Sequence, residues 1–218
     1  MKRRALIAGT AVLAAGAGCL NDDEPNDDDD AESDQSGPPF EVTTVDAPGS
    51  EAGTVSVPTD GQVQLINFIR TTCPTSRGML SYVGEARDRL ADAHDVGPDE
   101  EVLVMTVVNG SAGPQPSPSE LTDFWIEQDG HWTVGIDEPG ALFDHYDVTG
   151  TPTTVAVDDT GEVHWRDRGG TTAGNMVEGV ERALEESDDD AGESTAGNES
   201  ASASGNETEA VAAAANER

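Results

Sequence analysis

The chain has 218 residues, of which 44 are acidic and 11 are lysine or arginine, giving a formal net charge of −33. Lys2 is its only lysine, so every other strongly basic side chain is an arginine. Nucleic acids and anionic lipid surfaces would be repelled by this charge, and we do not expect them as partners. In concentrated salt such charges are screened over about 3 Å, so the composition indicates a protein of an extreme halophile.

The N-terminal sequence MKRRALIAGTAVLAAGAGCL begins with basic residues and continues with a short apolar run and small residues. This pattern predicts a secretory signal peptide over residues 1–18, which is too short to span a membrane. The Arg-Arg pair at 3–4 resembles a twin-arginine export signal, and GAGC at 16–19 resembles a lipobox. We therefore expect Cys19 to be lipidated and to anchor the protein at the cell surface, on the outer face of the cytoplasmic membrane.

The segments on either side of the central part are rich in acidic and small residues. Residues 19–39 contain NDDEPNDDDDAESD and predict a disordered, self-repelling tether, because this composition buries too little apolar surface to fold. Residues 186–218 are acidic, rich in Ser and Ala, and predict a disordered tail. A single domain is expected over residues 40–185, which is long enough to bury a core.

The first half of this domain predicts a strand–helix–strand unit. Residues 41–60 read as a small hairpin that precedes the main sheet. Residues 63–69 and 101–108 are continuous apolar runs, as expected for central strands covered on both faces. The residues between them show apolar positions at helical spacing and predict a helix that ends near residues 95–98. Two such strands joined by a helix are expected to be parallel neighbours.

The second half alternates short helices and strands. Turn signals at 129–130 and 158–161 divide it into segments of the length expected for single elements. The predicted elements are a helix capped by Ser117 or Ser119, a strand at 132–136, a helical turn at 141–146, strands at 153–157 and 163–166, and a last helix from Thr171 or Thr172 through Leu184.

The stretch NFIRTTCPTSRGML at 67–80 places Cys73 between a predicted strand and a predicted helix. A thiol at a helix N-terminus faces unpaired N–H groups and the positive end of the helix dipole, which favour the thiolate. Arg70 and Arg77 are close in sequence and are expected to add to this effect. Ser76 stands three residues later, where a dithiol redox protein has its second cysteine.

Taken together, residues 40–185 resemble the membrane-tethered thiol–disulfide oxidoreductases of the TlpA/ResA type. The resemblance rests on LINFIRTTCP, on the hairpin VTTVDAPG…VSVP, and on FDHYDVTGTPTTVAVDDTGEV, in which Thr151-Pro152 occupies the position of the family's cis-proline. It implies an α/β, thioredoxin-like fold with a central mixed sheet flanked by helices and an N-terminal hairpin. It also implies that Cys73 is the nucleophile, that Pro152 presents the backbone of Thr151 beside the sulfur, and that no cofactor takes part.

The chain departs from this family at Ser76, where the second cysteine would stand. An intramolecular disulfide with Cys73 cannot form, so a complete dithiol cycle is excluded. We expect Cys73 to form a mixed disulfide with exported protein thiols or disulfides, which a second thiol then resolves. Ser76 is expected to hydrogen-bond the thiolate.

Three other interpretations use the same fold and stay open. Cys73 is silent if the domain is a non-catalytic binding module. The copper-delivering SCO group has a second cysteine at the position of Arg77 and a histidine near Gly150, and a lone thiolate makes a poor copper site. Peroxiredoxins work with one cysteine but have a threonine at the position of Arg70. The four histidines show no ligand spacing, so no metal site is expected.

Overall fold

The computed structural model describes residues 37–111 and 113–196, with side chains described as far as Ser187. These residues contain seven strands in one sheet, together with helices between and after them. In chain order the elements are β1 (Phe40–Thr44), β2 (Gly53–Val57), β3 (Val63–Ile69), α1 (Pro74–Ala91), β4 (Val102–Asn109), α2 (Pro118–Glu127), β5 (Thr133–Asp137), α3 (Ala141–His145), β6 (Thr153–Val157), β7 (Val163–Arg168) and α4 (Ala173–Ala196).

The sheet is mixed and has the strand order β2-β1-β5-β4-β3-β6-β7. β3 pairs in parallel with β4, and β4 with β5, whereas β6 and β7 continue the sheet in antiparallel fashion. The hairpin β1–β2 joins the other edge through antiparallel pairing of β1 with β5. The predicted α/β, thioredoxin-like fold with a mixed sheet and an N-terminal hairpin is therefore confirmed.

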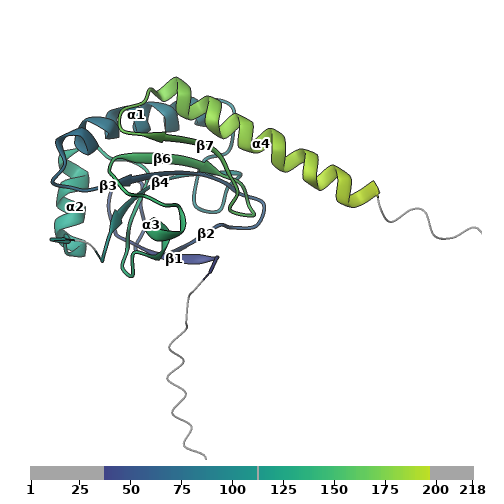
Figure 1. Ribbon diagram of the computed structural model, residues 1–218. Helices are drawn as coiled ribbons and strands as arrows, with labels where there is room; N and C mark the ends of the chain where they lie inside the picture. The colour runs from purple at the N-terminus through teal and green to yellow at the C-terminus, as the bar shows by residue number, and fades with distance from the viewer. Residues whose placement is uncertain (1–36, 112, 197–218) are drawn as a thin grey trace, which may run out of the picture. The chain divides into compact units, whose positions relative to one another are not determined.

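The two faces of the sheet have separate apolar layers, because alternate side chains of a strand point to opposite faces. Leu65 and Ile69 of β3 pack on the side of α1, α2 and α4, whereas Ile66 and Phe68 pack on the side of α3. Figure 1 shows α1 and α4 covering one side of the sheet and α3 lying against the other. Every residue of β3 is buried, which explains why most of its side chains are apolar.

Asn67 is one of two buried polar residues in this strand, the other being Gln64. It is fully buried, and its Nδ2 donates a hydrogen bond of 2.8 Å to Oγ1 of Thr154 on β6. This bond offsets part of the cost of burying the amide group, whose Oδ1 is buried without a partner among the described residues.

Helix α1 ends at Ala91, earlier than the expected end near residues 95–98. The reason lies in the sheet, because Val96 forms a parallel bridge with Val102 and Gly97 N–H donates to the Val102 carbonyl. The chain therefore leaves the helix early in order to pair beside β4.

Helix α2 begins with Ser117 as its N-cap. Its hydroxyl accepts from the backbone of Glu120, and the Glu120 carboxylate accepts from the backbone of Ser117, which forms a capping box. The choice between Ser117 and Ser119 is thus settled in favour of Ser117.

Helix α4 continues to Ala196, beyond the expected end of the domain at residue 185. The predicted signal peptide, the tether up to residue 36, Cys19 and residues 197–218 lie outside the described residues. Within the described part of the chain, no helix combines the length and the apolar character that a membrane span requires.

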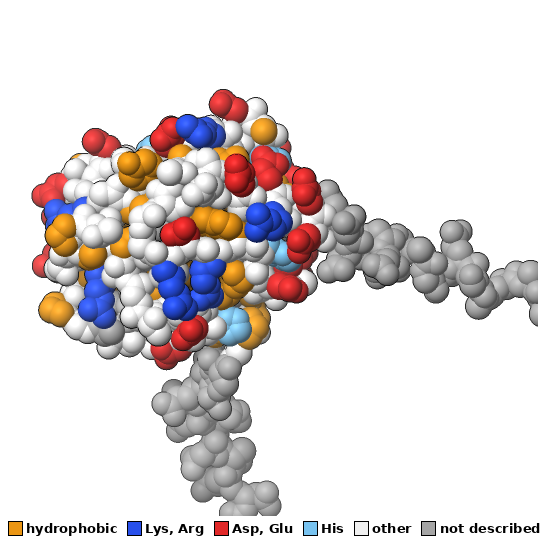
Figure 2. All heavy atoms as spheres, turned by 45° about the horizontal axis from the view of Figure 1, so that its top comes forward, with side chains coloured by type: hydrophobic (Ala, Val, Ile, Leu, Met, Phe, Trp, Pro, Cys, Tyr) orange, Lys and Arg blue, Asp and Glu red, His pale blue; other side chains and the backbone are white. Residues whose placement is uncertain are grey.

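Acidic side chains are spread over the face that Figure 2 presents, with fewer cationic side chains between them. They do not gather into one patch on this face. The acidic composition is therefore a general property of this surface and does not mark a binding site on it.

Candidate functional site

Cys73 is the N-cap residue of α1 and follows a tight turn after β3. Its backbone N–H donates to the Arg70 carbonyl at 3.0 Å, and its own carbonyl accepts from Arg77 N–H at 3.1 Å. Pro74 occupies the start of the helix, where the missing N–H costs nothing, and the first turn has no acidic residue. The half-buried sulfur therefore lies at the positive end of an 18-residue helix.

Ser76 and Thr75 hold the pKa of the Cys73 thiol below its usual value. The Ser76 side chain has the largest effect, followed by the Ser76 backbone N–H, while partial burial opposes them and the groups of Thr75 contribute less. The Ser76 hydroxyl is fully buried, and beside the neutral thiol it forms no regular hydrogen bond with any described residue. A thiolate at Cys73 is the acceptor that this donor lacks, which explains why the charged form is favoured.

Thr151 and Pro152 lie beside the sulfur because of the strand register. β6 runs antiparallel to β3 with Phe68 opposite Thr153, so the segment before β6 meets the segment after β3. The Cys73 thiol donates to the Thr151 carbonyl over a distance of 3.8 Å. The Thr151–Pro152 peptide bond is cis. The tertiary structure thus places the four predicted site residues of the domain close together: Cys73, Ser76, Thr151 and Pro152.

The two arginines near Cys73 take different positions. The Arg77 Nε donates to the Thr71 carbonyl at 2.8 Å, and its guanidinium group lies 5.2 Å from the ring centre of Phe124. Arg70 is exposed. Neither residue is among the groups that lower the pKa of Cys73, contrary to the expectation from their sequence positions.

Two hollows lie next to the segments around the thiol. One, of about 340 Å³, is lined by Thr71, Arg77 and Phe124 among others. The second, of about 360 Å³, is lined by Thr151 and by residues of the loops after β3, β4 and α3. Both hollows border the segments around the thiol, and Cys73 itself lines neither of them.

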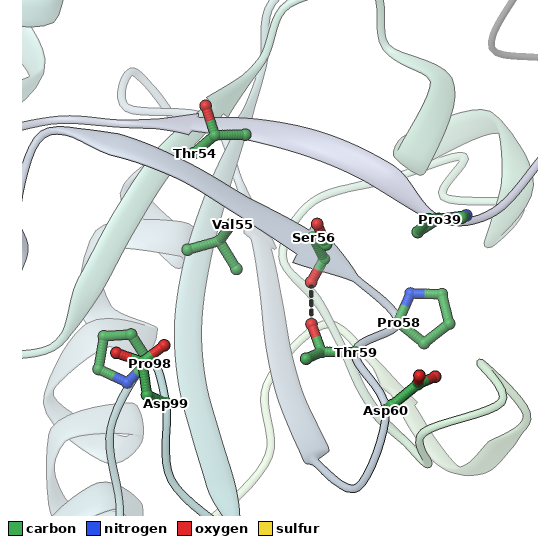
Figure 3. Close-up of a pocket in the computed structure, with 9 residues that line it drawn as sticks. All are labelled: Pro39, Thr54, Val55, Ser56, Pro58, Thr59, Asp60, Pro98 and Asp99. Carbon is green, nitrogen blue, oxygen red and sulfur yellow. Dashed lines mark hydrogen bonds between the residues drawn. The ribbon is translucent and has the colours of Figure 1, made fainter.

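A third hollow, of about 450 Å³, lies elsewhere (Figure 3). Its walls include Pro58 and Asp60, which come just before β3, and Thr59 Oγ1 donates there to the Ser56 carbonyl at 2.8 Å. Cys73 follows the opposite end of the same strand. This hollow is therefore not part of the thiol site.

Metal ligands do not cluster in the described part of the chain. Among these residues there is no group of three or more His, Cys, Asp or Glu side chains that could hold a metal ion. Cys73 is the free cysteine of this part, and it does not belong to such a group of potential ligands.

Thr75 is the residue of this site that the sequence reasoning missed. It stands at the second position of α1, where both its N–H and its hydroxyl are close to the N-cap side chain. Its position directly after Cys73-Pro74 indicates this contact, since N–H groups of the first helical turn point towards the N-cap side chain.

Comparison with known proteins adds a family and a set of folds. The family model described as Redoxin matches residues 32–184. StoA from Bacillus subtilis is 21% identical, with a TM-score of 0.51 over 64% of this chain and 93% of that chain. A putative thioredoxin from Neisseria meningitidis is 19% identical, with a TM-score of 0.54 over 71% and 93%.

The pneumococcal exposed lipoprotein thioredoxin Etrx1 from Streptococcus pneumoniae is 18% identical, with a TM-score of 0.53 over 66% of this chain and 98% of that chain. At these identities the similarity establishes the fold that the chains share. No curated protein matches the chain.

Proposed function

Because this chain belongs to the Redoxin family, we propose that its domain carries out thiol–disulfide exchange through Cys73 alone, on exported protein thiols and disulfides. The observation that supports this most strongly is the environment of the sulfur. Cys73 is half-buried at a helix N-terminus, and the Ser76 donor favours its thiolate. A reactive thiol needs this combination of access and lowered pKa.

The exchange takes place in two balanced steps. The Cys73 thiolate attacks one sulfur of a client disulfide, so that a new S–S bond forms, the client S–S bond breaks, and the leaving sulfur departs as a thiolate that takes a proton from water. A second thiol, deprotonated to solvent, then attacks the client sulfur of the mixed disulfide and releases Cys73 as a thiolate. The client disulfide is the oxidant and the second thiol is the reductant.

Ser76 and Thr151 have different roles in this scheme. Ser76 stabilises the thiolate before attack and again when Cys73 leaves, because its hydroxyl donates to the negative sulfur. Thr151 accepts from the neutral thiol and marks the side on which an extended client segment lies. Pro152 holds the Thr151 backbone at this position.

A Cys19→Ser background leaves Cys73 as the only thiol for the test. We expect a peptide disulfide to add one peptide to Cys73 faster than to the same cysteine in the unfolded chain, as measured by intact mass. The variant Cys73→Ser should take up none. Equal rates in the folded and unfolded chain would favour a binding module with a silent cysteine, and a faster reaction with hydrogen peroxide than with the peptide would favour a single-cysteine peroxidase.

A second variant tests whether a cysteine at position 76 can resolve the mixed disulfide. Ser76→Cys is expected to give an intramolecular disulfide with Cys73 and to release a bound peptide without added thiol. Ser76→Ala is the matched control, since it removes the hydroxyl without adding a sulfur. If Ser76→Cys kept the peptide bound as long as the control, the two positions would not be in the geometry that our proposal requires.

The same proposal locates the domain outside the cytoplasmic membrane, held by Cys19 on the tether of residues 19–39. Its support is the signal and lipobox pattern of the sequence. Cys19→Ser should move the protein from the membrane fraction to the medium and abolish incorporation of a labelled fatty acid. Unchanged fractionation of this variant would contradict the anchor.

A further inference from the structure

We propose that the polar hollow beside Thr151 binds the thiol that resolves the Cys73 mixed disulfide, and that this thiol is a small molecule with an amino-acid-like carboxylate and ammonium group. The inference rests on the proposed monothiol function. Ser76 stands where an internal resolving cysteine would be, so the second thiol must come from another molecule.

The hollow is built from loops that meet at one edge of the sheet. Arg70 follows β3, Asn109 ends β4, Asp144 belongs to α3, and Thr149 precedes β6; all four line the hollow. Because β3 and β4 are parallel, their carboxyl ends meet at the same edge, where ligands of α/β sheets commonly bind. Figure 1 shows this edge beside the start of α1.

The volume of the hollow limits the size of its ligand. At about 360 Å³ it is at the lower end of the range of small-molecule sites, roughly 300–1,000 Å³. A small thiol fits this space, whereas a folded protein partner would contact a much larger surface.

The hollow approaches the sulfur through Thr151, although Cys73 itself is not one of its lining residues. Thr151 is one of its lining residues, and the Thr151 carbonyl is 3.8 Å from Sγ of Cys73. A thiol held there lies close to a mixed disulfide at Cys73, beside the client segment that the Thr151 backbone marks. The hollow therefore has the position that a resolving thiol needs.

Two opposite charges at the hollow indicate the chemistry of the ligand. The Arg70 guanidinium group forms no hydrogen bond or ion pair with any described residue, whereas Arg77 and Arg168 are both engaged. The Asp144 carboxylate also lines the hollow and has no side-chain partner in the described domain. An arginine is suited to bind a carboxylate, and an aspartate an ammonium group. A zwitterionic thiol satisfies both.

Four small thiols distinguish the contribution of Arg70 from that of Asp144. L-cysteine has both groups, mercaptoacetate has the carboxylate, cysteamine has the ammonium group, and 2-mercaptoethanol has neither. The full chain in the Cys19→Ser background is first linked at Cys73 to an acetylated and amidated Gly-Cys-Gly peptide. The rate at which each thiol regenerates free Cys73 is then followed by acid quench and intact mass.

We expect the rate to saturate with L-cysteine and to rise linearly with 2-mercaptoethanol. Arg70→Gln should slow L-cysteine and mercaptoacetate about fivefold, and Asp144→Asn should slow L-cysteine and cysteamine by a similar factor, as for partly exposed ion pairs. Neither variant should change the rate with 2-mercaptoethanol. For each thiol, the rate with a variant is compared with the rate with the parent chain. Differences in pKa between the thiols therefore cancel.

Arg89→Gln is the matched control, because it removes the same charge from the outer surface of α1, where Arg89 pairs with Glu85. It should leave all four rates unchanged. A separate measurement needs no exchange chemistry: S-methylcysteine should slow the alkylation of Cys73 in the unlinked chain, and less so in Arg70→Gln or Asp144→Asn.

Linear rates with all four thiols, or equal slowing of all four by Arg70→Gln, would overturn the assignment of this hollow. The proposed function would survive that result, since the peptide had already attached to Cys73 and been released. If the peptide did not attach to Cys73 at all, the proposed function and this inference would both be wrong.

Discussion

The Sγ atom of Cys73 lies 3.8 Å from the carbonyl oxygen of Thr151, a residue 78 positions further along the chain. The contact exists because β3 and β6 are antiparallel neighbours in the middle of the sheet. In the exchange that we propose, it fixes the side from which a substrate reaches the sulfur. The other side is taken by the first turn of α1, whose donors stabilise the thiolate.

Ser76→Ala is expected to raise the pKa of the Cys73 thiol, because it removes the side-chain donor that lowers this pKa most. The pH dependence of Cys73 alkylation should therefore shift to higher pH, towards the value of free cysteine, about 8.5. Ser81→Ala is the matched control, since Ser81 is an exposed serine of the same helix that bonds to the Gly78 carbonyl. Identical midpoints in the two variants would show that Ser76 does not influence the sulfur.

His164 is expected to make the stability of the domain depend on pH. Burial alone would lower the pKa of His164, but hydrogen bonds with Asp158 at 2.6 Å and Glu186 at 2.5 Å outweigh it and raise this pKa. A raised folded-state pKa gives stability that is fully present below the unfolded value of about 6.5 and is lost as the pH rises through the folded value. Arg182 adds a hydrogen bond to the His164 carbonyl, which does not titrate.

The free energy of unfolding of His164→Gln should accordingly fall below that of the native sequence by about 1 kcal/mol at the acidic end of this window, and by less above it. Denaturant unfolding across the window measures the difference. The pKa of Asp158 is lowered in spite of burial, by His164 and Thr160, so its own contribution is lost only at more acidic pH. A difference that did not vary with pH would mean that His164 stays uncharged in the fold.

Gly130→Ala is expected to destabilise the domain by overpacking. A Cβ atom at Gly130 would lie 2.2 Å from the ring of Trp125, a fully buried side chain. Such overpacking costs about 1–3 kcal/mol. Gly78→Ala is the matched control: its Cβ would meet nothing within 4 Å, and alanine favours an exposed helical position by about 1 kcal/mol. Thermal unfolding should show opposite shifts for the two variants, and a neutral Gly130→Ala would mean that Trp125 has room to move.

Salt is expected to stabilise the domain, because the charges on its surface are mostly negative and repel one another. The free energy of unfolding should rise between about 0.1 M and about 1 M sodium chloride, where the screening length falls from about 10 Å to about 3 Å. Replacing the exposed acids Asp123 and Glu127 of α2 by their amides should weaken this dependence. An equal dependence in that variant would point to general salting-out instead.

The sequence by itself determined most of the elements and the position of the Cys73 thiol. The apolar runs of β3 and β4 predicted central strands because neither offers a polar face to water, and both strands are found where the runs are. The order of strand, Cys73 and helix is local, so the placement of the thiol at a helix start could also be predicted. The same short-range chemistry reduced the N-cap of α2 to two serines, whereas the end of α1 depended on the pairing of Val96 with Val102.

Only the tertiary structure decided what surrounds the sulfur. Arg77 is near Cys73 in sequence but turns to Thr71 and Phe124, while Thr151 is far away in sequence and lies next to the thiol. The hollow with Arg70 and Asp144 arises from loops that only the sheet order brings together. Side-chain direction and strand register depend on packing across the whole domain, and a linear pattern does not contain them.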